Sequence, residues 1–497
     1  MMKFIKHSYV VLGVLLIVYY ITRNIGLDVL PIFNDESTYI RFGLYQVKEL
    51  DPQPYSLLIG KEPLIPQLLG LYGSSAENLL LGARSVIVFW GSLTLIGIFL
   101  FSKHLVSLRA AIFASALYIC NPFSLFFDRL ALLDSAVSAI SIWSLFLTYL
   151  VLQTKKWRYV ACLGIVMGIG LWIKASSAFY LVLPCIAGAV YLYQHKFKTQ
   201  LRNDLLKLFG TAVGLGLLIF LPLYTHPMYA EHLILLKQYT YPLHSIFLFP
   251  ITVWIANAEG LLTWLPLYLT PVLFLLIVIS GYRLREKPYV WLLLLWFLLP
   301  FLYELLYAKL LTARHLLPLT VSLFVLAGYG LDLIRSFHRV LTYGIVIVII
   351  VWSGYIVMPL YTDPQQFPDR FVGRATTDMD QYVHGFSSGY GVVEAVDYLR
   401  KKADEQPIII FIRNDYGNPE DAIVAYLNYH PHVLIVPIGN GAEEFPLIRN
   451  EIDPTTPIYY VSRGGANAGL ESYFVESKIF EKPNDAEFIG VHLLKRE

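Results

Sequence analysis

The chain has 497 residues, of which 56% are hydrophobic and only 15% are charged. This balance differs from that of soluble domains and predicts an integral membrane protein. The formal net charge is +2 and no basic patch emerges, which argues against a nucleic-acid partner. Neither a disulfide framework nor a zinc site is expected, because the three cysteines lie in or beside apolar runs, at Cys120, Cys162 and Cys185.

The first predicted element is an apolar run from about Tyr9 to Ile21, preceded by Lys3 and Lys6. A signal peptide has the same layout. The residues that follow, TRNIGLDVLPIFNDE, offer no small-residue cleavage site. We therefore interpret the run as an uncleaved first membrane span.

Further apolar runs, each long enough to cross roughly 30 Å of hydrocarbon, follow along the chain. Together they predict about eleven spans, at about 9–22, 80–101, 108–126, 132–152, 158–174, 176–193, 206–224, 261–281, 289–307, 315–334 and 340–360. The basic connections all fall on the side of the N-terminus, which indicates a cytoplasmic N-terminus. The outer side then carries residues 23–78, the turn near 121–132, the segments 225–260 and 308–314, and everything after 361.

Two regions outside the spans have structure of their own. In the loop 23–78, apolar residues and isolated charges alternate at helical spacing, which is typical of helices in the membrane interface. After Pro359 the composition becomes more polar, and strand-like runs at 407–413, 433–438, 457–463 and 488–494 alternate with helical patterns. We therefore predict an α-helical polytopic membrane protein, with a transmembrane module at 1–361 and an extracytoplasmic linker and small α/β domain at 362–497.

Charged residues gather on the predicted outer side. Asp35 and Glu36 follow the first span, and Asp134 stands at the start of the fourth, where an ionised side chain is costly. Each charge has a simpler interpretation when taken alone: a hydrated carboxylate, a surface ion pair of Asp128 with Arg129, or a cation that reaches lipid headgroups. The cations on this side are Lys61, Arg129, Lys174 and Arg314, with His315 beside the last.

Carboxylates and cations together indicate a particular chemistry. Arg and Lys suit phosphate oxygens, and a carboxylate can take the proton from an attacking hydroxyl. The set predicts a site that holds an anionic headgroup while a proton is removed from a second substrate.

Four short motifs resemble the GT-C superfamily of polytopic glycosyltransferases, in particular protein O-mannosyltransferases and the aminoarabinose transferases that modify lipid A. They are the acidic pair at 35–36, Lys61-Glu62-Pro63, RLALLDS at 129–135 and RHLLP at 314–318. The resemblance implies an inverting transfer of a sugar from a polyprenyl-phosphate carrier to an acceptor on the extracytoplasmic face of the cell membrane.

The same resemblance implies roles for single residues. Asp35 would be the general base, Glu36 would support or orient it, and Asp134 would be a second carboxylate near the acceptor or the donor sugar. The carrier phosphate would be bound by Lys61, Arg129 and Arg314, with His315 a weaker candidate. No cofactor other than the donor is implied. A divalent metal stays open, because one branch of the superfamily uses one and another does not.

The acceptor is open as well. Protein mannosyltransferases carry a β-trefoil domain in an outer loop, and no loop of this chain is long enough to hold one. A glycan, a lipid or a protein thus remains as acceptor. Two other functions also remain: a transporter or lipid-linked-sugar flippase, although the charges cluster at one face rather than at mid-span, and a non-catalytic sensor whose tail binds a glycan.

Overall fold

The computed structural model describes residues 2–49, 53–76, 78–367, 376–483 and 487–495. The chain forms two compact units. The first comprises residues 1–25, 53–65 and 84–358, and the second comprises 26–52, 66–83 and 359–497. Residues 368–375, part of the predicted linker, lie outside the described residues.

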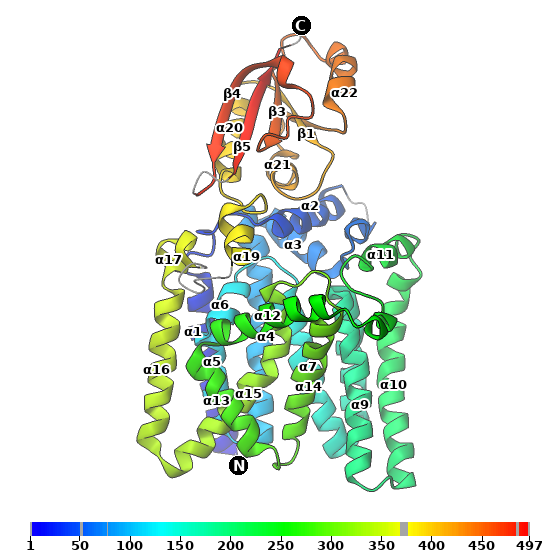
Figure 1. Ribbon diagram of the computed structural model, residues 1–497, viewed down its shortest axis with the longest axis vertical. Helices are drawn as coiled ribbons and strands as arrows, with labels where there is room; N and C mark the ends of the chain where they lie inside the picture. Colours follow the sequence, from blue (N-terminus) through cyan, green and yellow to red (C-terminus); the bar gives the residue numbers. More distant parts are fainter. Residues whose placement is uncertain (1, 50–52, 77, 368–375, 484–486, 496–497) are drawn as a thin grey trace. The chain divides into compact units, whose positions relative to one another are not determined.

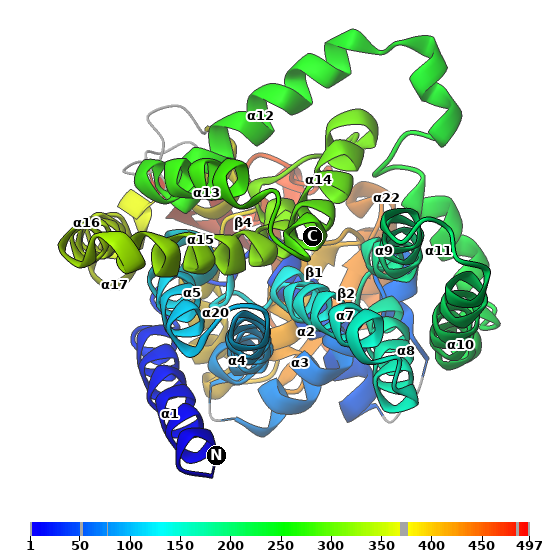
Figure 2. The same ribbon diagram turned by 90° about the horizontal axis from the view of Figure 1, so that it is seen from below.

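The first unit is a helical bundle, whose helices run side by side in Figure 1 and are seen along their axes in Figure 2. Short helices α6, η1, η2, α11, η3 and η4 cover Pro122–Phe127, Tyr55–Ile59, Ala175–Ala178, Tyr229–Leu236, Leu243–Leu248 and Ala313–Leu316. The long helices are α1 (Met2–Asn24), α4 (Leu79–Leu105), α5 (Leu108–Cys120), α7 (Asp134–Thr154), α8 (Trp157–Ile173), α9 (Phe179–Gln194), α10 (Thr199–Tyr224), α12 (Ile251–Leu269), α13 (Pro271–Leu284), α14 (Val290–Tyr307), α15 (Leu317–Phe337) and α16 (Arg339–Val357).

Seven helices within the described ranges are long and apolar enough to cross a membrane, and the pair α12 and α13 passes the same test together. Shorter apolar helices lie at Ser8–Asn24, Leu108–Cys120 and Trp157–Ile173. The predicted polytopic helical fold is confirmed, and the count of eleven spans stays a prediction.

The predicted span at 261–281 contains a sharp bend. Helices α12 and α13 meet at an angle of 104°, and α12 lies across the direction of the other helices in Figure 1. Thr270 at the junction has φ 68° and Pro271 begins α13. Because proline has no N–H to continue the ladder of α12, the chain leaves the helix there.

Helices α7 and α15 form the interior of the bundle. The apolar windows of these two helices are 89% and 78% buried, against 28% for α16, which identifies them as the enclosed pair. Small residues let α15 approach α5 closely: a Cβ on Gly328 would lie 2.6 Å from the carbonyl oxygen of Ala110. Small residues at such contacts are the usual means of packing membrane helices.

The second unit is built on a five-stranded sheet of order β2-β1-β3-β5-β4. Strands β1, β2 and β3 are parallel, whereas β5 runs antiparallel to both β3 and β4. The strands are β1 (Ile408–Arg413), β2 (Val433–Ile438), β3 (Ile458–Arg463), β4 (Phe474–Glu481) and β5 (Phe488–Leu494), and the main helices are α2 (Asn34–Lys48), α3 (Leu64–Ser75), α20 (Val392–Glu405), α21 (Glu420–Leu427) and α22 (Gly441–Ile448), with short α17 (Pro359–Thr362) and α19 (Thr376–Met379).

Each face of the sheet buries alternate residues of its strands. Phe411 and Tyr460 point to one face and pack with Phe445 of α22. Tyr459 lies on the other face, where its ring meets Tyr398 of α20. Four of the strands are the ones predicted from apolar runs, and the predicted small α/β domain is confirmed.

Candidate active site

A carboxylate with two cations lies at one end of the bundle. Asp134 occupies the first turn of α7, where a helix dipole favours negative charge. Lys174, at the end of α8, places its Nζ 2.6 Å from Asp134 Oδ1, and Arg314 of η4 places its Nε 3.9 Å from Oδ2. The Asp134 side chain is only 4% exposed. Three separate helical segments therefore meet at one buried carboxylate.

Further charges of the same unit surround this group. His315 is close enough to Asp134, Lys174 and Arg314 to interact with them electrostatically. It interacts with Lys61 in the same way, so both residues are part of this group of charges. Glu304 of α14 interacts electrostatically with Lys174 and Asp134. We call Lys61, Asp134, Lys174, Glu304, Arg314 and His315 the charged cluster.

Sequence reasoning missed Glu304 and left Lys174 ambiguous. Both stand alone in apolar runs, PFLYELLY and GLWIKASS. A lone ionisable residue inside an apolar run marks a functional candidate by its cost, and this signal could have found them.

Two contacts hold the segment that contains Lys61 and Glu62. The Lys61 ammonium lies 4.4 Å from the ring centroid of Tyr239. Its neighbour Glu62 is buried and meets His232 Nε2 at 3.1 Å. The buried Glu62 anchors the segment that carries Lys61, while a cation over an aromatic face remains able to bind an anion.

Asp128 and Arg129 do not form a surface pair. Asp128 is fully buried, its Oδ2 lies 3.7 Å from Arg23 Nη2, and the hydroxyls of Tyr19 and Tyr118 donate to it at 3.1 and 2.8 Å. Arg129 is also buried and donates to the Thr22 carbonyl oxygen at 3.5 Å. The Asp128 network fastens α1 to the α5–α6 region, and phosphate binding by Arg129 stays a prediction.

The acidic pair belongs to α2, in the second unit. Glu36 is fully buried, and its carboxylate accepts a hydrogen bond from the Phe33 backbone N–H at 2.9 Å, as a helix cap does. Asp35 is partly exposed, and the side-chain amide of Asn34 donates to it at 3.5 Å. Glu36 thus orders the turn that carries Asp35.

An apolar groove of about 250 Å³ lies between α9 and α14. Phe179 and Tyr303 meet across it with ring centroids 4.8 Å apart. Glu304 adjoins Tyr303 on α14, and Phe179 follows the short helix η2 that comes after Lys174, so both walls lead to residues of the charged cluster.

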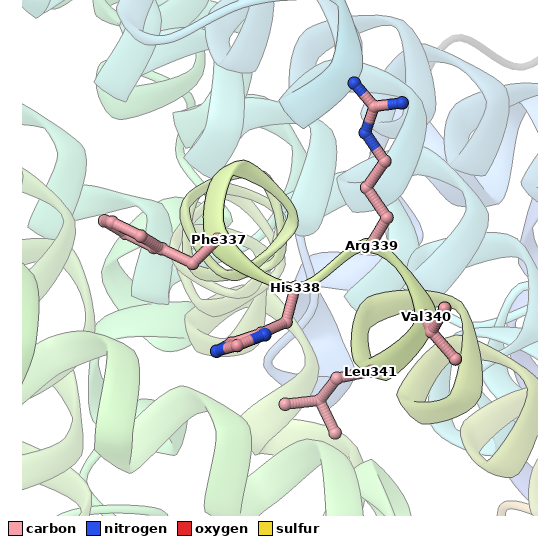
Figure 3. Close-up of a pocket in the computed structure, with 5 residues that line it drawn as sticks. All are labelled: Phe337, His338, Arg339, Val340 and Leu341. Atoms are coloured by element: carbon pink, nitrogen blue, oxygen red, sulfur yellow. The ribbon is translucent and has the colours of Figure 1, made fainter.

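A larger hollow, of about 520 Å³, is lined by Phe337, His338, Arg339, Val340 and Leu341. Figure 3 shows these side chains spreading apart around the turn between α15 and α16. Arg314 precedes α15 and this turn follows it, so the two ends are roughly 30 Å apart at 1.5 Å per residue. The hollow is therefore remote from the charged cluster.

Within the described ranges, no group of three or more His, Cys, Asp or Glu residues is placed to hold a metal ion.

One protein-family model matches part of the chain. The family model for dolichyl-phosphate-mannose-protein mannosyltransferases matches residues 63–226, a range that contains RLALLDS and Lys174. A search of curated sequences gives no match.

Two solved structures share the fold. ArnT from Cupriavidus metallidurans, bound to undecaprenyl phosphate, superposes with a TM-score of 0.61 at 14% identity and covers 97% of both chains. The chain therefore has the fold of this membrane protein. The oligosaccharyltransferase AglB from Archaeoglobus fulgidus, in complex with an inhibitory peptide and a dolichol-phosphate, has a TM-score of 0.51 at 13% identity, covering 92% of this chain and 69% of its own. The fold shared with ArnT extends over nearly the whole chain, the C-terminal domain included.

Proposed function

We propose that this protein transfers a sugar from a polyprenyl-phosphate carrier to a hydroxyl group, with inversion, on the extracytoplasmic face. The observation that carries the proposal is the charged cluster, where Lys174 and Arg314 converge on Asp134 at one end of the bundle. Cations next to an apolar groove suit a ligand that has a phosphate head and a hydrocarbon tail. The ArnT and AglB structures contain such carriers.

In this proposal the carrier phosphate is bound by Lys61, Lys174, Arg314 and Arg129, with His315 beside them. Asp35 takes the proton from the acceptor hydroxyl, and Glu36 holds its turn of α2. The acceptor oxygen attacks the anomeric carbon as the bond from that carbon to the phosphate oxygen breaks. The electron pair leaves with the polyprenyl phosphate, whose negative charge the cations stabilise. Asp134 orients Lys174 and Arg314. In this proposal the donor sugar lies beside the phosphate that these cations bind, and the Asp134 carboxylate contacts it there.

The test begins with lipid extracted from the purified protein and identified by mass spectrometry, which names the carrier. Purified protein is then incubated with ¹⁴C-labelled undecaprenyl-phosphate mannose, glucose and 4-amino-arabinose, together with an envelope extract of the expressing cells. We expect labelled product and free undecaprenyl phosphate from the wild type, and a loss of at least about a hundredfold in Asp35→Asn and in Asp134→Asn. Wild-type transfer in both variants would overturn the assignment. Movement of intact labelled donor across sealed vesicles, with no bond broken, would support a flippase.

A further inference from the structure

The parallel strands of the C-terminal sheet have the order β2-β1-β3, which contains a switch in strand order like that of flavodoxin-like sheets. From β1 the chain passes through α21 to β2 on one side, and from β2 it passes through α22 to β3 on the other side of β1. In open α/β sheets, ligands bind at the carboxyl ends of the strands where the order reverses. Here that position is the loop 414–419 after β1, next to the end of β3, and Arg463 joins the two by donating to the Tyr416 carbonyl oxygen at 3.0 Å.

In this unit the switch position is filled by the beginning of α2. The backbone N–H of Asn418 donates to Asn34 Oδ1 at 2.7 Å, and its side-chain amide donates to the Ile32 carbonyl oxygen at 2.9 Å. The backbone N–H of Asn34 donates in turn to the Ser387 carbonyl oxygen at 2.9 Å. These bonds hold the residues on the N-terminal side of Asp35.

A second set of contacts holds the side of α2 that follows Asp35. Asp421, at the start of α21, accepts hydrogen bonds from the Thr38 hydroxyl and from the Arg41 guanidinium, while the Gly417 N–H at 2.6 Å fixes the same carboxylate from its own loop. The Asp421 side chain is fully buried. A buried carboxylate that accepts several hydrogen bonds fixes the position of its donors, because any shift of a donor leaves a carboxylate oxygen without a partner.

Gly389 and Gly417 pack closely against the residues at the beginning of α2. A Cβ on Gly389 would lie 2.2 Å from the Ile32 carbonyl oxygen, and one on Gly417 would lie 2.0 Å from Asn34 Oδ1. A Cβ added to Gly465, in the turn after β3, would have no other atom within 4 Å. Gly389 and Gly417 therefore leave no room for a side chain beside residues 32–34.

We propose that the C-terminal domain positions Asp35, and that Asn418 and Asp421 are the positioning residues. This inference rests on the proposed function, in which Asp35 is the base. The place where related sheets bind a ligand is used here to clamp the first turn of α2. A general base must lie within hydrogen-bond reach of the proton it removes, and a misplacement of 1 Å costs on the order of a hundredfold in rate.

The test uses the full-length protein in detergent. Thr38→Val removes the hydrogen bond from the Thr38 hydroxyl to Asp421 with little change of shape. Thr38→Ser keeps the hydroxyl and this hydrogen bond. Gly389→Ala pushes on Ile32, and Gly465→Ala is the matched control. Hydrogen exchange of the amides of residues 36–40 and transfer from the labelled undecaprenyl-phosphate panel are measured on each variant.

We expect Thr38→Val and Gly389→Ala to speed exchange and to lower kcat at least about tenfold with KM for the donor within about twofold. Thr38→Ser and Gly465→Ala should behave as the wild type. In the Asp35→Asn background, Thr38→Val should cause no further loss of rate, whereas a loss of general stability would add to it.

Full transfer by Thr38→Val beside an inactive Asp35→Asn would overturn this inference and leave the proposed function standing. Full transfer by Asp35→Asn would overturn the proposed base and this inference together. A further loss in the double variant would assign Thr38 a purely structural role and would also count against the proposal.

Discussion

Two buried ion pairs of the helical unit allow a structural role to be separated from a functional one. Arg23 with Asp128 is fully buried, and Lys174 with Asp134 is 20% and 4% exposed. Breaking a buried pair by removing one partner costs about 3–5 kcal/mol, because the other charge is left without compensation. We expect Arg23→Met to lie at the upper end of that range. Lys174→Met should lie at the lower end, since Arg314 remains 3.9 Å from Asp134.

Removing both charges should restore at least part of the lost stability in each case. Asp128→Asn in the Arg23→Met background keeps an acceptor for the hydroxyls of Tyr19 and Tyr118. Replacing a whole buried pair by neutral residues is often close to neutral, so we expect this double variant to return within about 1–2 kcal/mol of the wild type and to transfer sugar normally. The matched double variant of Lys174→Met with Asp134→Asn should recover part of the lost stability, because Arg314 then loses the carboxylate that lies 3.9 Å from it.

Transfer should separate the two double variants. The Lys174 and Asp134 variant should remain on the order of a hundredfold slower, because a cation aimed at the developing phosphate charge is missing. Unfolding in detergent gives the free energies, and transfer from labelled undecaprenyl-phosphate sugars gives the rates. If this variant regained both stability and rate, the Lys174 pair would be structural, and the reasoning from the charged cluster would be wrong.

Three further predictions concern other parts of the chain. Tyr303→Ala in the groove should weaken binding of undecaprenyl phosphate about tenfold and leave binding of a short-chain prenyl phosphate unchanged, as measured by lipid titration in nanodiscs. Lys482→Met should speed hydrogen exchange of residues 385–388 in the intact protein, because the Lys482 ammonium donates to the carbonyl oxygens of Gly385, Phe386 and Ser388 at 3.0, 2.9 and 2.9 Å. Burial lowers the pKa of His492, so the unfolded state binds more protons just below pH 6.5, and stability rises with pH up to about 6.5 and is lost on acidification. The protection factors of the β3 and β5 amides, which correct for the intrinsic rise of amide exchange with pH, should therefore be lower at pH 5.5 than at pH 7.5 in the wild type, and this difference should shrink in His492→Gln.

Much of the fold follows from local patterns in the sequence. The runs that become β1, β2, β3 and β5 are largely apolar and rich in β-branched and aromatic residues, which is typical of strands, and those of β1 and β3 are buried on both faces. Strand β4, FVESKIFE, was missed because charged residues interrupt its apolar residues, whereas β2, the other edge strand, is continuously apolar. The bend between α12 and α13 was missed because hydropathy does not register backbone direction, although the Thr270-Pro271 step marks it.

The candidate site is only partly visible in the sequence. Topology alone placed Lys61, Asp134 and Arg314 on one side of the membrane, and the structure brings them into one electrostatic cluster. The union of α2 with α21 could not be predicted, because Thr38 and Asp421 are 383 positions apart. No short-range pattern encodes a hydrogen bond of that separation.

The candidate residues are divided between the two units, and this division has a mechanistic consequence. The cations proposed for the carrier phosphate belong to the helical unit, whereas Asp35 belongs to the unit that contains the C-terminal sheet. Binding of the carrier and removal of the acceptor proton are then stabilised by different sets of contacts. Asp421→Asn should therefore lower the rate of transfer without changing the affinity for undecaprenyl phosphate, while Lys174→Met should change both.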